Sequence, residues 1–174
     1  DLAEQDTAVP FVNEVASTAR QVIWLMGNHE YYGGGLISTL ENLSGKVCSN
    51  VTVTDQAVMD IDDVRFICAT LWTDFNNGDP VKMSQAKFFM SDYTYIMGIN
   101  SETIFDRFRK DVTFIEDNLF LETDKKKIVV THHAPSRRSI NERFKDAQGN
   151  ECFCSDLDDL FFIDNAPDVW IHGH

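Results

Sequence analysis

Histidine, the most common metal ligand among side chains, occurs at five positions, and all five lie in three short segments. The segments are Gly27-Asn28-His29-Glu30, Thr131-His132-His133-Ala134-Pro135 and Ile171-His172-Gly173-His174. Imidazole nitrogens and a carboxamide oxygen are suitable ligands for a divalent transition metal. The sequence therefore contains the side chains for a metal site in three separated pieces.

Each histidine segment follows an apolar run that is typical of a buried strand. These runs cover 21–26, 127–130 and 168–171. A strand that ends in an imidazole or a carboxamide places that group at the carboxyl edge of a sheet, where α/β proteins form their sites. The pattern predicts a metal site assembled from loops at such an edge.

The order Asn-His-Glu, His-His, Gly-His resembles that of the calcineurin-like metallophosphoesterases, and the resemblance covers essentially the whole chain. In that family two metals are held by Asp-x-His, Gly-Asp, Gly-Asn-His-Glu, a later His and Gly-His-x-His. Asp1 resembles the bridging aspartate of Gly-Asp, and His174 resembles the first histidine of Gly-His-x-His. Because the Asp-x-His and the last His are missing, we expect the chain to be part of a longer protein.

The resemblance implies a ligand set for the metals. It makes Asn28 and His132 ligands of one ion, with His174 joining them and Asp1 bridging to the second. Mixed oxygen and nitrogen ligands favour Mn, Fe or Zn over Mg or Ca. The complete protein should hold two metals, whereas this chain is expected to bind at most one well and to hydrolyse phosphate esters poorly or not at all.

The function implied by the resemblance is hydrolysis of a phosphomonoester or phosphodiester by a hydroxide that the metals activate. His29 is then a catalytic residue beside the scissile phosphate, donating a hydrogen bond to the leaving oxygen or to the developing charge. The alternatives are a nuclease with the same centre and a non-catalytic scaffold with the same fold. Retention of His29 argues against the scaffold, which would not need a donor to the leaving group.

Several neighbouring residues have two interpretations. Glu30 either orients His29 or its loop, or is an exposed carboxylate at a helix start. His133 either faces the phosphate or packs under the loop, and His172 is expected to be a buried histidine within its strand. Arg137 and Arg138 either reach a bound phosphate or are solvated loop arginines.

The composition limits the partners. The formal net charge is −13, which opposes tight binding to a long nucleic acid, because such binding depends on clustered Lys and Arg. A small phosphorylated substrate is compatible with this charge.

The four cysteines match neither a zinc ribbon nor a disulfide framework, so reduced thiols and a cytoplasmic location are expected. The pair Cys152-x-Cys154 could alternatively bind a metal or form a redox pair. No apolar stretch approaches the ~18 residues of a membrane span.

The periodicity predicts alternating helices and strands in one domain over 1–174. Helices are expected near 9–20, 36–43, 82–90 and 101–121, and strands at 21–26, 51–54, 57–60, 64–71, 127–130 and 168–171. Asp62-Asp63 should turn a hairpin, 72–80 and 136–154 should be loops, Ser101 should cap the long helix, and Ser155 or Asp156 should cap a short one.

This alternation, with hairpins in the middle, indicates an α/β sandwich with mixed sheets. The resemblance sharpens it to two mixed sheets packed together and flanked by helices. Because the first strand of the family fold is absent, one sheet should be incomplete. Its free edge would lower the stability or pair with a second copy.

Overall fold

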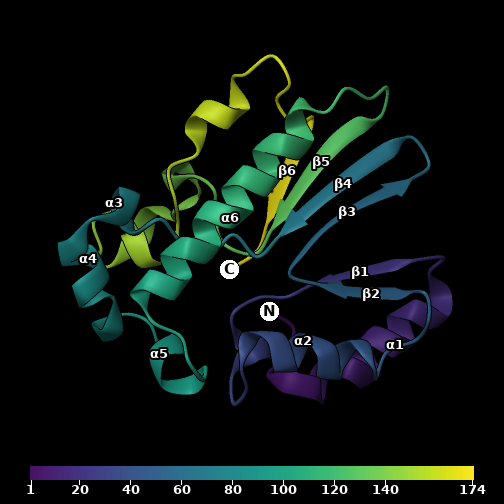
Figure 1. The fold of residues 1–174 in the computed structure, drawn as a ribbon, viewed down its shortest axis with the longest axis horizontal. Coiled ribbons are helices and arrows are strands. Elements are labelled where there is room, and N and C mark those ends of the chain that lie inside the picture. Colours follow the sequence, from purple (N-terminus) through teal and green to yellow (C-terminus); the bar gives the residue numbers. More distant parts are fainter.

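A computed structural model describes all residues from Asp1 to His174. It has two sheets with helices around them (Figure 1). The strands are β1 (Val22–Leu25), β2 (Val51–Thr54), β3 (Gln56–Ile61), β4 (Val64–Ala69), β5 (Lys126–Thr131) and β6 (Val169–His172). The helices are α1 (Val9–Thr18), α2 (Leu36–Ser44), α3 (Phe75–Gly78), α4 (Pro80–Gln85), α5 (Asp92–Tyr95) and α6 (Ser101–Phe120). Short 3₁₀ turns cover Gln5–Ala8, His29–Tyr31, Ala86–Phe88, Arg137–Ser139, Glu142–Phe144, Asn150–Cys152 and Asp158–Phe161.

The sheets confirm the α/β class predicted from the sequence. The larger sheet is mixed and has the order β3-β4-β5-β6, in which β3 and β4 are antiparallel and the other neighbours are parallel. The smaller sheet is the parallel pair β1-β2. The hairpin between β3 and β4 turns at Asp62, whose φ of 54° lies in the left-handed region that Asp tolerates.

One apolar core joins the two sheets and the long helix. Trp24 and Met26 extend into it from β1 and its end, Ile67 from β4, and Ile115 and Leu119 from α6. Figure 1 shows α6 lying across one face of the four-stranded sheet, while α1 and α2 lie against β1 and β2. Burial of these faces, at roughly 25 cal/mol per Å² of apolar area, holds the strand ends in place around the site.

The helix α6 follows its apolar periodicity but has a different cap. Its N-cap is Asn100, whose Oδ1 accepts a hydrogen bond from Thr103 N at 2.8 Å while Thr103 Oγ1 accepts one from Asn100 N at 2.8 Å. Ser101 is the first helical residue, and its hydroxyl donates to Met83 O. The predicted cap was wrong by one residue because asparagine in the preceding position forms the reciprocal capping box.

Two further expectations about the connections need correction. The 3₁₀ turn Asp158–Phe161 has Leu157 before it and no side-chain cap, because the Ser155 hydroxyl instead accepts a hydrogen bond from Asp74 N. The segment 72–80, predicted as a loop, contains the one-turn α3, in which Asn76 and Asn77 have left-handed φ values of 57° and 60°.

No helix in the structure is both long and apolar enough to cross a membrane.

Candidate metal centre

Parallel pairing brings the ends of three strands to one edge of the larger sheet. Ala69 of β4 is opposite Thr131 of β5, and Thr131 is opposite His172 of β6. Just past the strand ends, His133 N donates a hydrogen bond to Thr70 O at 3.1 Å. The second and third histidine segments are therefore adjacent, although about 40 residues of sequence separate His132 from His174.

The first histidine segment reaches the same place from the smaller sheet. Thr70 Oγ1 donates to Met26 O at 2.9 Å, which connects the ends of β4 and β1. The chain then passes so close to the second segment that a Cβ on Gly27 would lie 2.6 Å from Cε1 of His132. Only glycine fits there. The close approach places the Asn28 side chain against the His132 ring.

Three predicted ligands converge on a ring nitrogen of the fourth. Nε2 of His132 lies 3.0 Å from Asn28 Oδ1, 3.0 Å from His174 Nδ1 and 3.4 Å from Asp1 Oδ1. A neutral imidazole nitrogen can donate at most one hydrogen bond. The lone pairs of the surrounding atoms therefore exceed the available protons, and a divalent cation would satisfy them together. This donor set of two imidazoles, one amide oxygen and one carboxylate fits Mn, Fe or Zn.

Burial keeps the imidazoles in the form that binds metals. His132 is 4% exposed, and burial lowers its pKa to about 2. The ring of His174 packs against those of His132 and His133, and desolvation of the imidazole lowers its pKa to about 4. Both rings are neutral at pH 7, so each offers a lone pair to a metal without first losing a proton.

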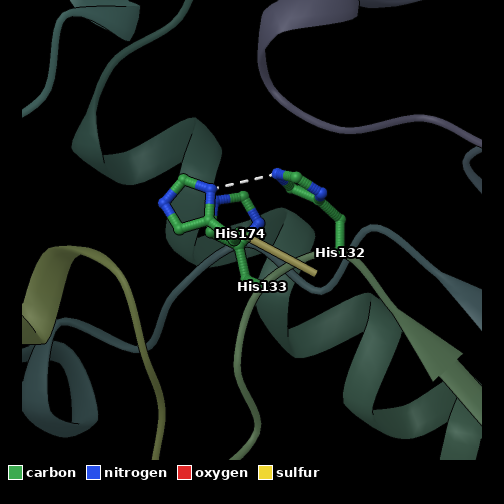
Figure 2. A group of neighbouring side chains, drawn as sticks. All are labelled: His132, His133 and His174. Carbon is green, nitrogen blue, oxygen red and sulfur yellow. Dashed lines mark hydrogen bonds between the residues drawn. The ribbon is translucent and has the colours of Figure 1, made fainter. Parts of the chain in front are cut away.

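His133 lies beneath the cluster, which agrees with the interpretation that it packs under its loop. It is fully buried, and its ring stacks between those of Trp72 and His174, at centroid distances of 5.3 Å and 4.5 Å. Its Nδ1 lies 3.3 Å from Thr70 O, whereas Nε2 is buried without a partner. Figure 2 shows the rings of His133 and His174 close together, with the dashed contact from His174 to His132. One ligand atom from each of the three histidines lies within 4.8 Å of the others.

The comparisons with known proteins agree with this geometry. The sequence matches the family model described as calcineurin-like phosphoesterase over residues 3–174. The chain belongs to the calcineurin-like phosphoesterase family. It is also 24% identical, over 187 residues, to an uncharacterized protein of Acanthamoeba polyphaga mimivirus, an alignment that covers 94% of this chain and 64% of that protein. The chain thus spans somewhat less than two thirds of that relative's length, and no solved structure gives a significant match.

In this member of the calcineurin-like phosphoesterase family, His29 is next to the cluster but not part of it. Its backbone N–H donates to Asp1 Oδ1 at 3.0 Å, while its ring is exposed and stacks on Tyr32 at 4.4 Å. Tyr32 in turn stacks on Tyr95 of α5 at 5.0 Å. The aromatic stack fixes the ring at the surface of the site, where it can meet a solute.

Glu30 is buried and orients the loop, not His29. Its Oε2 accepts a hydrogen bond from Gly27 N at 2.9 Å, and its Oε1 accepts one from Leu2 N at 2.6 Å. The side chain is 0% exposed, so the interpretation as an exposed carboxylate was wrong. One carboxylate thereby fixes the turn before Asn28 and the backbone next to Asp1.

Asp92, a buried residue near Asn28, could not be selected from the sequence. Its carboxyl is 2% exposed, and its Oδ1 has no hydrogen-bond partner. Burial raises the pKa of this carboxyl, and the nearby Asn28 side chain opposes the rise. Tyr32 also interacts with the Asn28 amide. Asn28 Oδ1 itself lies 3.0 Å from His132 Nε2. Asp92 follows no apolar run and matches no motif, so only the fold places it here.

A strained turn after β4 supports the buried ring of His133. Leu71 and Trp72 have left-handed φ values of 69° and 41° although neither is glycine. Such residues cost about 1–2 kcal/mol each. The turn is held by Asp111 of α6, whose Oδ2 accepts a hydrogen bond from Leu71 N at 2.8 Å. A residue far along the sequence therefore keeps Trp72 stacked against the histidine cluster.

The two arginines are exposed and have other partners. Arg137 Nη2 donates to Asn76 Oδ1 at 2.8 Å. Arg138 forms an ion pair with Asp158 at 2.9 Å and is 73% exposed. Neither guanidinium contacts the four predicted ligands, which favours their interpretation as solvated loop arginines.

His172 is not buried, contrary to the prediction. It is half-exposed, and its Nε2 lies 2.8 Å from Ser139 Oγ while Nδ1 lies 3.0 Å from Gly173 O. The reason is that β6 is an edge strand, so its side chains are less covered than the apolar run suggests.

The environment of Cys152 and Cys154 does not favour metal binding by this pair. Both thiols are free and buried. Burial raises the pKa of Cys152 to about 12 and that of Cys154 to about 11. Metal ligation and thiol exchange both require the thiolate, which this environment disfavours.

Proposed function

We propose that this chain is the metal-binding part of a hydrolase that cleaves a phosphomonoester or a phosphodiester. The observation that carries the proposal is the convergence of Asn28 Oδ1, His174 Nδ1 and Asp1 Oδ1 on Nε2 of His132. Three segments far apart in the sequence meet with more lone pairs than protons, which is a costly arrangement unless a cation binds there.

Asp1, Asn28, His132 and His174 would hold the metal, with Mn, Fe or Zn as candidates. When bound, a divalent ion of this kind polarises the phosphoryl group and makes an attacking water more acidic. Asp1 also accepts the His29 N–H, so one carboxylate links the ligand set to the backbone of the proposed catalytic residue.

His29 would assist departure of the leaving group. Its ring is exposed, in contrast to the buried rings of His132 and His133, and the stack on Tyr32 limits its rotation. A ring nitrogen that faces solute can donate a hydrogen bond to the leaving oxygen, a role typically worth about 10² to 10⁴ in rate. A small substrate suits the net charge of −13 better than a long nucleic acid does.

The first experiment is elemental analysis of the purified chain beside three variants. Asn28→Ala and His132→Ala remove predicted ligands. His172→Ala is the control, because the ring of His172 contacts Ser139 and not the predicted ligands. We expect roughly one bound metal in the wild type and in His172→Ala, and a loss of that metal in the two ligand variants.

Hydrolysis is then measured with added Mn on p-nitrophenyl phosphate and bis-p-nitrophenyl phosphate. Manganese-dependent release of nitrophenol that disappears in His29→Ala, with metal content unchanged, would support the catalytic role. A wild type without bound metal, or equal metal content in all four proteins, would refute the proposed centre. Cleavage of single-stranded DNA in preference to both esters would favour the nuclease alternative.

A further inference from the structure

A cavity of about 440 Å³ lies next to the histidine cluster. His174, from the end of β6, forms part of its wall, and residues between Ser139 and Cys154 form most of the rest. His174 is also a predicted metal ligand, so the cavity and the predicted metal site share this residue. Its size is at the lower end of the range for small-molecule sites, about 300–1,000 Å³.

Two aromatic rings line the cavity without being fully covered. Phe153 stacks on the His174 ring at a centroid distance of 5.6 Å and an angle of 22°, and it is 36% exposed. Phe144 is 48% exposed, and its ring lies 4.4 Å from the guanidinium carbon of Arg143. Ile140 adds a further apolar surface. Exposed apolar rings gathered at one hollow indicate a surface that gains free energy when an apolar group covers it.

The cavity wall carries no formal charge. None of its 12 lining residues is Asp, Glu, Lys or Arg, although a quarter of the residues in the chain are charged. Its polar groups include the carboxamides of Asn141 and Gln148, which can donate and accept hydrogen bonds. A charged organic group would find no Asp, Glu, Lys or Arg among the lining residues and would lose hydration on entering, although the Arg143 guanidinium packs on Phe144 beside the wall.

The segment that carries the aromatic rings is tied down locally. Asn150 Nδ2 donates to Phe144 O at 2.7 Å, and the Thr73 hydroxyl donates to Glu151 O at 2.6 Å. The second bond connects this segment to the strained turn after β4, which also supports His133. The cavity and the histidine cluster therefore share one support.

We propose that this cavity binds the organic part of the substrate, and that the substrate is a phosphate ester of an uncharged aromatic or heteroaromatic group. The inference rests on the proposed function, because it requires the phosphoryl group to lie at the histidine cluster. The aromatic group would stack on Phe153 and Phe144, and the carboxamides would meet polar atoms at its edge.

The test measures binding, so it does not depend on turnover. Phosphonates cannot be hydrolysed at the P–C bond by this chemistry, and their affinities for the Mn-loaded chain can be compared by calorimetry. The probes are methylphosphonate, benzylphosphonate and 4-carboxybenzylphosphonate. We expect benzylphosphonate to bind on the order of tenfold more tightly than methylphosphonate, and the charged ring to lose that gain.

Variants locate the effect. Phe144→Ala and Phe153→Ala should abolish the preference for benzylphosphonate over methylphosphonate. Phe120→Ala, at an exposed phenylalanine that ends α6, should leave the preference unchanged. The ratio of the two affinities is the readout, because loss of Phe153 could also move His174 and weaken both ligands equally.

The outcomes separate this inference from the proposed function. If both phosphonates bind in a metal-dependent manner with equal affinity, the cavity does not select aromatic groups and the inference fails, while the proposed function stands. The same conclusion follows if the preference survives both phenylalanine variants. If neither phosphonate binds in a metal-dependent manner, the proposed function fails and the inference with it.

Discussion

The buried carboxylate of Glu30 accepts a hydrogen bond of 2.6 Å from the backbone N–H of Leu2, 28 residues earlier in the chain. Its second oxygen accepts one from Gly27 N. Because Asp1 and Asn28 are the residues next to these two donors, one side chain fixes the backbone at two of the four predicted ligands. Supporting contacts of this kind commonly influence metal affinity as much as the ligands do.

Glu30→Gln should weaken metal binding although Glu30 contacts no predicted metal position. The amide would present an NH₂ group to one of the two N–H donors, leaving a buried donor without an acceptor. We expect about a 10- to 100-fold lower Mn affinity by calorimetry and a loss of roughly 1–3 kcal/mol in the free energy of unfolding. Glu142→Gln, at an exposed glutamate, is the control. Unchanged Mn affinity in Glu30→Gln would contradict the anchoring role.

Gly27→Ala should separate the first histidine segment from the second. The added methyl group would clash with Asp1 Oδ1 and lie 2.6 Å from Cε1 of the His132 ring, so the Asp1 side chain, the ring or the turn must move. We expect the bound metal to be lost while far-ultraviolet circular dichroism shows that the fold is retained. Gly45→Ala is a matched control, since a Cβ there would meet its nearest atom at 3.7 Å. Full metal content in Gly27→Ala would show that the two segments need not touch.

Asp92→Leu should impair metal binding through Asn28. The substitution keeps a similar volume but removes the buried carboxyl whose pKa the Asn28 side chain influences, so the amide could turn its nitrogen towards His132. We expect about 10- to 100-fold weaker Mn binding. Asp92→Asn, which retains an acceptor oxygen, should recover most of the affinity. Equal losses in both variants would mean that Asp92 acts through packing alone.

Asp111 should make the stability of the folded chain depend on pH. Burial raises the pKa of this carboxyl from 3.8 to about 7, so the folded state holds its proton more tightly than the unfolded state does. The stabilisation from this proton is present below about pH 4 and is lost as the pH rises to about 7.

The difference between the wild type and Asp111→Asn isolates this effect. In urea unfolding between pH 4 and pH 8, the free energy of unfolding of the wild type should fall relative to that of Asp111→Asn, by on the order of a few kcal/mol. Asp106→Asn, at an exposed aspartate on the same helix, should follow the wild type. Parallel curves for the wild type and Asp111→Asn would show that Asp111 titrates normally.

The amino-acid sequence determined much of this protein directly. The apolar periods predicted the strands near the site to within one or two residues, because burial of an apolar run is a local property of the chain. The histidines at the strand ends predicted which side chains would meet, since parallel strands end at a common edge. The resemblance to a known family then singled out Asn28, His132 and His174 as ligands and added Asp1, which follows no strand.

Only the tertiary structure decided the supporting contacts. Asp92 and Asp111 have no distinctive spacing, and they matter because packing buries their carboxyls beside Asn28 and Leu71. The half-exposed position of His172 depends on β6 being an edge strand, and the uncharged cavity beside His174 depends on how 139–154 folds back. The positions of residues in the sequence specify only their separation along the chain. Burial and hydrogen-bond partners depend on which residues are close together in the folded structure.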